Sequence, residues 1–182
     1  HGSYIVGENQ EGFYLIDQHA AKERVNYEYY KRKFARFDAT YQDLLVPLVF
    51  ELPMSEYLII QEKKDLLLEV GIELIEFGQN SFIVKKLPIW MHQINEKKYI
   101  DDMIEQILRE DKVDRMVLQD HAIATLSCKA SLKANTYLTL NDMQAIIDDL
   151  MRCDNPYVCP HGRPTVIFYS SYELEKLFKR VV

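Results

Sequence analysis

Three residues that could hold a metal ion lie close together near the start of the chain. Asp17, His19 and Glu23 follow an apolar run, Phe13–Ile16, that is typical of a buried strand. In extended backbone the first two would face the same side. From Ala20 the residue types favour a helix, in which His19 and Glu23, four apart, share one face. Carboxylates with an imidazole suit Mn²⁺ or Zn²⁺, so the sequence predicts a metal site where a strand passes into a helix.

A second group of ligand-type residues lies far along the chain. Residues 159–164, CPHGRP, contain Cys159 and His161 in a segment that its two prolines keep from being helical. Thiolate and imidazole are zinc ligands. Each residue alone also has a structural interpretation: Asp17 near a helix N-cap, His19 a partly buried histidine, Cys159 a small apolar residue. Five such residues in two short stretches together favour a metal site.

Three further residues are candidates for supporting roles. Glu28 lies five residues beyond Glu23, about 140° around a helix, and fits the cluster less well. Cys128 lies on a long helical pattern and is either a buried small residue or a polar neighbour of the site. Arg163 could hold a phosphate bidentately or pair with a carboxylate.

Two of these stretches resemble motifs of a known family. Residues 17–28, DQHAAKERVNYE, resemble the DQHA(X)2E(X)4E motif of MutL family DNA mismatch-repair proteins, in their C-terminal, endonuclease-bearing form. Residues 159–164 match the family's CPHGRP motif. Residues 127–135, SCKASLKAN, resemble a third motif, with Ser127 where many members carry Ala and Lys129 where they carry Arg or His. The resemblance is to bacterial members and covers most of the chain.

The resemblance implies a metal-dependent endonuclease that nicks duplex DNA by phosphodiester hydrolysis, with Asp17, His19 and Glu23 catalytic. Metal chemistry adds a mixed site: Zn²⁺ held by Glu23, Cys159 and His161, and a second cation, Mn²⁺ or Mg²⁺, or the reacting water near Asp17 and His19. The alternative is a closed zinc site that only stabilises a non-catalytic dimerisation and clamp-interaction module.

The resemblance also implies partners. The spacing of Gln42, Leu45, Val46 and Pro47 resembles the peptide by which such proteins engage the bacterial sliding clamp, with the glutamine in a polar slot and the apolar pair in a pocket. The alternative is an ordinary strand that continues into residues 48–50. The family further implies a homodimer and an N-terminal ATPase domain, and this sequence carries no ATP-binding motif.

Composition limits how the chain meets DNA. A net charge of −6 and a pI near 5.4 argue against tight unaided binding to duplex DNA. We therefore expect weak DNA binding and delivery by another component. No apolar run approaches the roughly 20 residues of a membrane span. Three cysteines without disulfide spacing indicate a reducing cytosol, and we expect a cytoplasmic, nucleoid-associated protein.

The predicted fold class is α+β. We expect a small mixed sheet with helices that forms a dimerisation and endonuclease subdomain from residues 1–39 and 113–182. An inserted α/β regulatory subdomain, 40–112, would interrupt it. Its predicted elements include a hairpin of strands 72–77 and 81–87. In the first subdomain we expect a hairpin of strands near 4–7 and 13–16, and a helix capped by Asn141 with Gln144.

Overall fold

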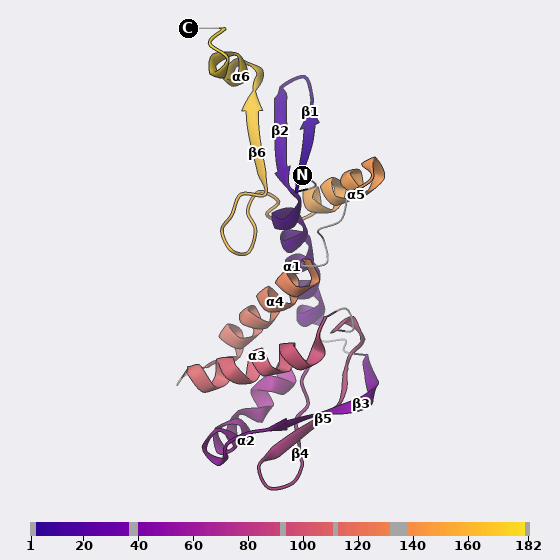
Figure 1. Cartoon of the computed structure of the whole chain (residues 1–182), viewed down its shortest axis with the longest axis vertical. Helices are drawn as coiled ribbons and strands as arrows, with labels where there is room; N and C mark the ends of the chain where they lie inside the picture. The colour runs from indigo at the N-terminus through magenta and orange to yellow at the C-terminus, as the bar shows by residue number, and fades with distance from the viewer. Residues whose placement is uncertain (1–2, 37–39, 92–93, 111–112, 132–137, 181–182) are drawn as a thin grey trace. The chain divides into compact units, whose positions relative to one another are not determined.

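The computed structural model describes residues 3–36, 40–91, 94–110, 113–131 and 138–180. The chain divides into two compact units, the first formed by residues 1–29 with 130–182 and the second by residues 30–129. The divisions fall within two helices, α1 (Gln18–Arg36) and α4 (Arg115–Ser131), which Figure 1 shows as continuous ribbons. A separate regulatory subdomain with boundaries at 39/40 and 112/113 stays a prediction.

The sheet of the first unit has three strands in the order β1-β2-β6, namely β1 (Tyr4–Glu8), β2 (Gly12–Asp17) and β6 (Val166–Ser170). The predicted N-terminal hairpin is confirmed. Both pairings are antiparallel, so the expected α+β class is confirmed but a mixed sheet is wrong. A three-residue turn joins β1 to β2, and such a short connection permits only antiparallel pairing.

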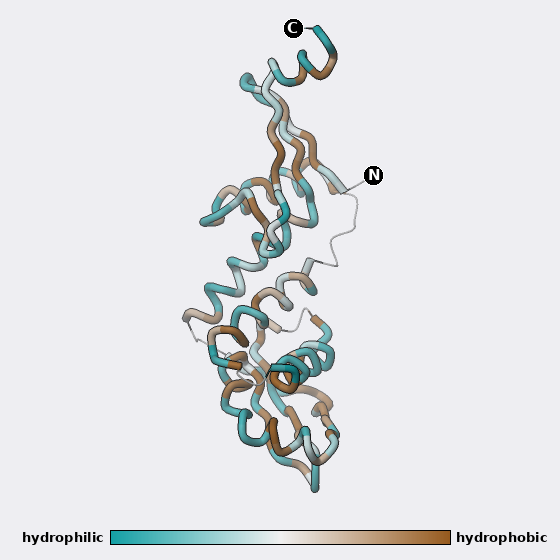
Figure 2. The backbone as a smooth tube through the Cα atoms, turned by 90° about the vertical axis from the view of Figure 1, so that its left-hand side faces the viewer, coloured by the Kyte–Doolittle hydropathy of each residue, from teal (hydrophilic) through white to brown (hydrophobic). Residues whose placement is uncertain are grey.

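The two faces of this sheet differ. On one face Ile5 and Ile16 join Ala21 and Leu150 in a buried core, against which α5 (Leu140–Met151) packs apolar side chains. On the other face the cross-strand partners are Val6, Leu15 and Ile167. Val6 is 62% exposed and Ile167 is 42% exposed. Figure 2 shows brown, apolar stretches along these strands. One apolar face of the sheet is therefore uncovered among the described residues.

Two helices of this unit begin with capping boxes. The side chain of Thr139 accepts a hydrogen bond from the Asp142 backbone N–H at 3.2 Å, and Asp142 accepts one from the Thr139 N–H at 2.9 Å. The predicted cap at Asn141 with Gln144 is therefore wrong by two residues: Thr139 and Asp142 have the same spacing, and the helix starts at Leu140. Ser170 caps α6 (Ser171–Leu177) in the same way.

The second unit packs helices on another antiparallel sheet. Its strands have the order β3-β5-β4, namely β3 (Tyr41–Glu51), β5 (Ser81–Pro88) and β4 (Ile75–Glu76). Its further elements are α2 (Met54–Glu69), the 3₁₀ turn η1 (Ile89–Met91) and α3 (Glu96–Arg109). Tyr57 of α2 stacks on Phe82 of β5 with ring centroids 4.6 Å apart, and both side chains are buried. The core of this unit is thus covered by α2.

The second predicted hairpin forms over fewer residues than expected. Only residues 75–76 of the predicted strand 72–77 pair with β5. Gly71 adopts a positive φ of 85°, and the Ile72 N–H donates to the Leu67 carbonyl at 2.9 Å. The segment after the glycine therefore closes the end of α2 before a strand can begin.

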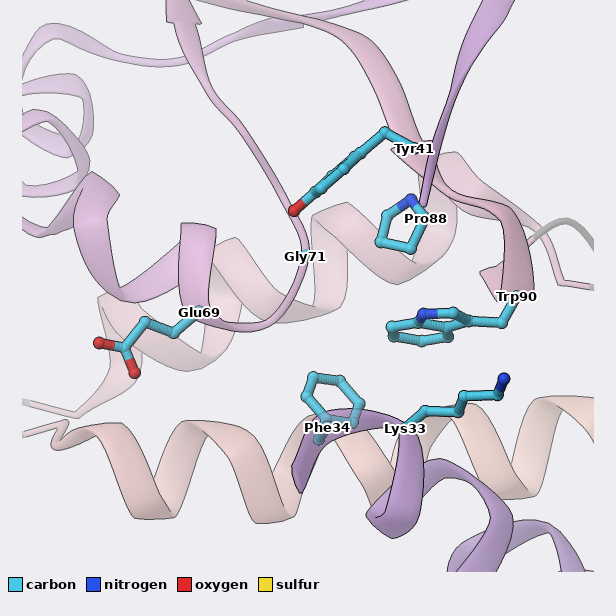
Figure 3. Close-up of a pocket in the computed structure, with 7 residues that line it drawn as sticks. All are labelled: Lys33, Phe34, Tyr41, Glu69, Gly71, Pro88 and Trp90. Atoms are coloured by element: carbon cyan, nitrogen blue, oxygen red, sulfur yellow. The ribbon is translucent and has the colours of Figure 1, made fainter. Parts of the chain in front are cut away.

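A small pocket in the second unit does not qualify as a ligand site. The labelled residues of Figure 3 line it: Lys33, Phe34, Tyr41, Glu69, Gly71, Pro88 and Trp90. Among them, Phe34 and Trp90 pack edge to face with their ring centroids 5.1 Å apart. Its cavity volume is about 10 Å³. A cavity needs roughly 10–15 Å³ to hold a single water molecule, so this one offers no room for a substrate.

In the part of the chain that the structure describes, no helix combines the length and apolar character needed to cross a membrane.

Candidate metal centre

The junction of β2 and α1 is fixed by a single carboxylate. The backbone N–H groups of His19 and Ala20 donate to Oδ1 of Asp17 at 2.9 and 3.0 Å. Asp17 therefore caps α1, and the helix starts at Gln18, two residues earlier than expected. The Asp17 N–H in turn donates to the Thr165 carbonyl at 2.9 Å. This bond holds the junction next to the residue that precedes β6.

The CPHGRP segment forms a tight loop. The Cys159 N–H donates to the Arg163 carbonyl at 2.8 Å, and the Gly162 N–H donates to the Cys159 carbonyl at 3.0 Å. Gly162 has a φ of 81°, a conformation that other residues adopt only with strain. The backbone therefore curls so that the loop presents Cys159 and His161 from one short segment.

Helix α1 also holds the segment that leads into this loop. Glu28 is buried, and its two carboxylate oxygens accept from the backbone N–H groups of Asp154 at 2.9 Å and Asn155 at 3.3 Å. Arg24 donates from Nε to the Val158 carbonyl at 2.6 Å. Glu28 thus contacts the segment that precedes the loop rather than a ligand. Sequence reasoning did not single out Arg24, because its partner Val158 lies 134 residues further along the chain.

Three of the predicted ligands come together. Glu23, Cys159 and His161 each offer a ligand atom, and these atoms all lie within 4.8 Å of one another. Across the described residues this is the one group of three or more such side chains. Glu23 and Cys159 are each 1% exposed, whereas the His161 side chain is 46% exposed. The cluster therefore has a buried floor and one side open to solvent.

The Glu23 carboxylate is the centre of this network. It lies 3.1 Å from Nε2 of His19, 3.3 Å from Nδ1 of His161 and 2.7 Å from Nη2 of Arg163. Burial by itself raises the pKa of Glu23, but the charge of Arg163 and the hydrogen bonds of His161 and Arg163 outweigh burial and lower it. A hydrogen bond to Cys159, with the charge of Glu23, raises the pKa of Arg163. The carboxylate is therefore held ionised, the form that binds cations.

This donor set fits zinc. A carboxylate oxygen, a thiolate and an imidazole are the ligands that Zn²⁺ takes in proteins, and three protein ligands with one open position characterise catalytic zinc sites. The partly exposed edge of the cluster at His161 leaves a direction from which a fourth ligand can approach.

The remaining predicted residues are not in this group. Asp17 lies at the helix start, and His19 reaches the cluster through its contact with Glu23. Cys128 is half-buried on α4 and belongs to the second unit, so a role for it in the metal site stays a prediction.

The predicted clamp segment, residues 42–47, lies in β3 where the pairing with β5 is irregular. Asp43 pairs with Lys86 and Leu48 pairs with Val84, so residues 44–47 face a single residue of β5. Leu45 is fully exposed and Val46 is 75% exposed. The segment is therefore part of a strand, with a bulge at residues 44–47, and clamp binding stays a prediction.

Comparisons with known proteins agree with the motifs. The family model described as the MutL C-terminal dimerisation domain matches residues 1–138. The DNA mismatch repair proteins MutL of Bacillus cytotoxicus and Bacillus anthracis are each 47% identical to this chain over all 182 residues. That of Listeria welshimeri is 45% identical over the same length. The chain spans 28% to 30% of the length of these relatives.

Proposed function

The chain belongs to the MutL family of DNA mismatch-repair proteins, and we propose that it is the part of such a protein that nicks duplex DNA by metal-assisted phosphodiester hydrolysis. The observation that carries the proposal is the meeting of Glu23, Cys159 and His161 within 4.8 Å of one another beside an open edge. A structural zinc site is closed by four protein ligands, whereas this group offers three ligands beside an open edge.

The chain's own residues divide between two cation positions. Glu23, Cys159 and His161 would hold Zn²⁺, and Asp17 with His19 would hold Mn²⁺ or Mg²⁺, or orient the reacting water. When bound, divalent cations supply Lewis acidity at the phosphorus and lower the pKa of water. Both capping bonds of Asp17 go to Oδ1. We therefore assign its other carboxylate oxygen to the reaction.

Arg163 has a second proposed task. Its side chain is 52% exposed while it pairs with Glu23. A guanidinium can hold a phosphate bidentately, so we assign Arg163 to a DNA phosphate once a cation takes over the charge of Glu23.

The partners follow from charge and exposed surface. With a net charge of −6 the chain should bind DNA weakly by itself. Delivery would come from the sliding clamp, bound through Gln42, Leu45, Val46 and Pro47 of the β3 bulge, and from the family's N-terminal ATPase domain. The protein would act in the cytoplasm at the nucleoid.

We assign self-association to the uncovered face of the first sheet. The family model is described as a dimerisation domain, and Val6 and Ile167 on this face are large, apolar and exposed. An apolar sheet face of this kind is stabilised by burial against a second copy.

The experiment that tests nicking is Asp17→Asn in the 182-residue chain. Asparagine caps helices about as well as aspartate, so folding should be preserved while the carboxylate is lost. We expect nicking of supercoiled plasmid with Mn²⁺ to fall by about a hundredfold or more, with unchanged zinc content and circular dichroism. Normal nicking by the Asp17→Asn chain would show that Asp17 is not catalytic.

The second candidate is a zinc-stabilised dimerisation and clamp-interaction module without catalysis, which the description of the family model favours. It predicts that the unaltered chain binds zinc and dimerises but leaves plasmid intact with Mg²⁺, Mn²⁺ or Zn²⁺. Metal analysis and nicking assays on the same preparation separate the two functions.

A further inference from the structure

The segment of residues 154–165, which carries two of the proposed ligands, is held by α1 at two points and by Asp17, the last residue of β2, at a third. Glu28 holds the backbone N–H groups of Asp154 and Asn155, and Arg24 holds the carbonyl of Val158, the residue before Cys159. The far end is held by the bond from the Asp17 N–H to the Thr165 carbonyl.

We propose that Arg24 and Glu28 are positioning residues that set the distance between the ligand on α1 and the ligands on the loop. The inference rests on the proposed metal centre. Glu23 directly precedes Arg24, so the ligand and both anchors belong to one rigid helix. Any shift of the loop along α1 therefore changes the distances from Glu23 to Cys159 and His161.

The strength of the Glu28 anchor comes from its charge. Hydrogen bonds from backbone N–H groups to a carboxylate are about twice as strong as neutral ones, and here both oxygens are used. Arg24 lies 3.9 Å from Glu28, and its side chain is 11% exposed. The side chains of both anchors are thus largely buried, whereas Asp154, Asn155 and Val158 are exposed, so loss of an anchor replaces a charge-assisted hydrogen bond by a weaker one to water.

Glu28→Gln is the sharpest change because it keeps the shape of the side chain. Glutamine has one acceptor oxygen, so only one of the two N–H groups can be satisfied, and the other meets an NH₂ donor. Glu28→Asp keeps both acceptors on a shorter side chain and should rank between Glu28→Gln and the unaltered chain. Arg24→Gln tests the second anchor independently.

Asp142→Asn provides the matched control. Asp142 also accepts a backbone hydrogen bond, from Thr139, and the same charge is removed, but it lies at the start of α5 rather than on the loop. The variants at Glu28 and Arg24 and the control should all stay folded, as measured by circular dichroism.

The measurements are Zn²⁺ affinity by chelator competition and the sulfur-to-metal charge-transfer absorption of Co²⁺-loaded protein. We expect Glu28→Gln to weaken zinc binding by about tenfold to a hundredfold, the range of changes to residues that orient ligands. The absorption band from Cys159 should shift or weaken. Asp142→Asn should change neither quantity. The spectral change separates positioning from a general loss of stability, which leaves the environment of the bound metal as it was.

Two outcomes overturn the inference, and a third bears on the proposed function. Zinc affinity and spectrum that are the same in Glu28→Gln and the unaltered chain show that Glu28 does not position the loop. An equal loss in Asp142→Asn shows a general effect. If the unaltered chain binds no zinc, the proposed metal centre fails. In that case, amide hydrogen exchange of residues 153–163 tests the anchoring by itself. If exchange is no faster in Glu28→Gln than in the unaltered chain, the inference is overturned.

Discussion

The two sheets of the molecule expose apolar side chains in different ways. In β1-β2-β6, within the described residues, one face carries the exposed apolar side chains Val6 and Ile167, which lie on the two strands that flank β2. In β3-β5-β4 the central strand is buried, and the most exposed apolar residues, Leu45 and Val46, project where β3 bulges.

This difference separates two kinds of interaction. A broad sheet face offers many weak contacts and suits a partner of matching shape, such as a second copy. A bulged strand with one or two projecting apolar side chains suits a pocket on another protein, as peptide recognition does. Under the proposed function, self-association and recruitment would therefore use separate surfaces.

The largest effect should come from charge on the face. Val6→Glu places a carboxylate among apolar partners, and its burial without a counterion is costly. We expect the dimer dissociation constant to rise by at least about a hundredfold, as measured by sedimentation equilibrium. Leu45→Glu, a charge on the bulge, should leave the dimer intact. A dimer unaffected by Val6→Glu uses another surface.

A smaller effect should follow removal of the apolar pair on the bulge. Leu45→Ser with Val46→Ser should weaken binding to the bacterial sliding clamp by about tenfold or more, because buried apolar anchors dominate such contacts. Surface plasmon resonance measures it, with Leu58→Ser on α2, also exposed, as the control. Equal affinities for the double variant and the unaltered chain would remove this segment from recruitment.

The smallest effect concerns stability. Because Leu45 and Val46 are exposed, the same double variant should change the free energy of unfolding by no more than about 0.5 kcal/mol. Urea titration gives this value. A loss of several kcal/mol would mean that the bulge packs within the molecule, and the contrast between the two sheets would then disappear.

The elements were largely predictable because their signals are local. Strand β2 and helix α1 follow from an apolar run and a change of residue type. The errors are of two kinds. The prediction that Asn141 caps α5 was wrong because two overlapping capping patterns, at Thr139 and at Asn141, cannot be told apart in the sequence. The strand predicted at 72–77 is shorter in the structure because the chain after Gly71 first closes the end of α2.

Three of the predicted ligands were placed together correctly, whereas the geometry at Asp17 was not foreseen. The pairing of Glu23 with Cys159 and His161 followed from ligand chemistry and family resemblance, and the structure brings these three together. Asp17 was expected to share a face with His19, but the helix starts at Gln18 and the carboxylate caps it. The anchoring by Arg24 is a contact across 134 residues, and no local pattern reports such a contact.

The distance in sequence between the ligands has a consequence for biosynthesis. Glu23 and His161 are 138 positions apart. A ribosome that has finished α5 has made the helix with its carboxylate but not yet the thiol or the imidazole of the loop. Under the proposed function, a chain interrupted between α1 and the CPHGRP loop cannot cut the chromosome, because it lacks two of the three proposed zinc ligands.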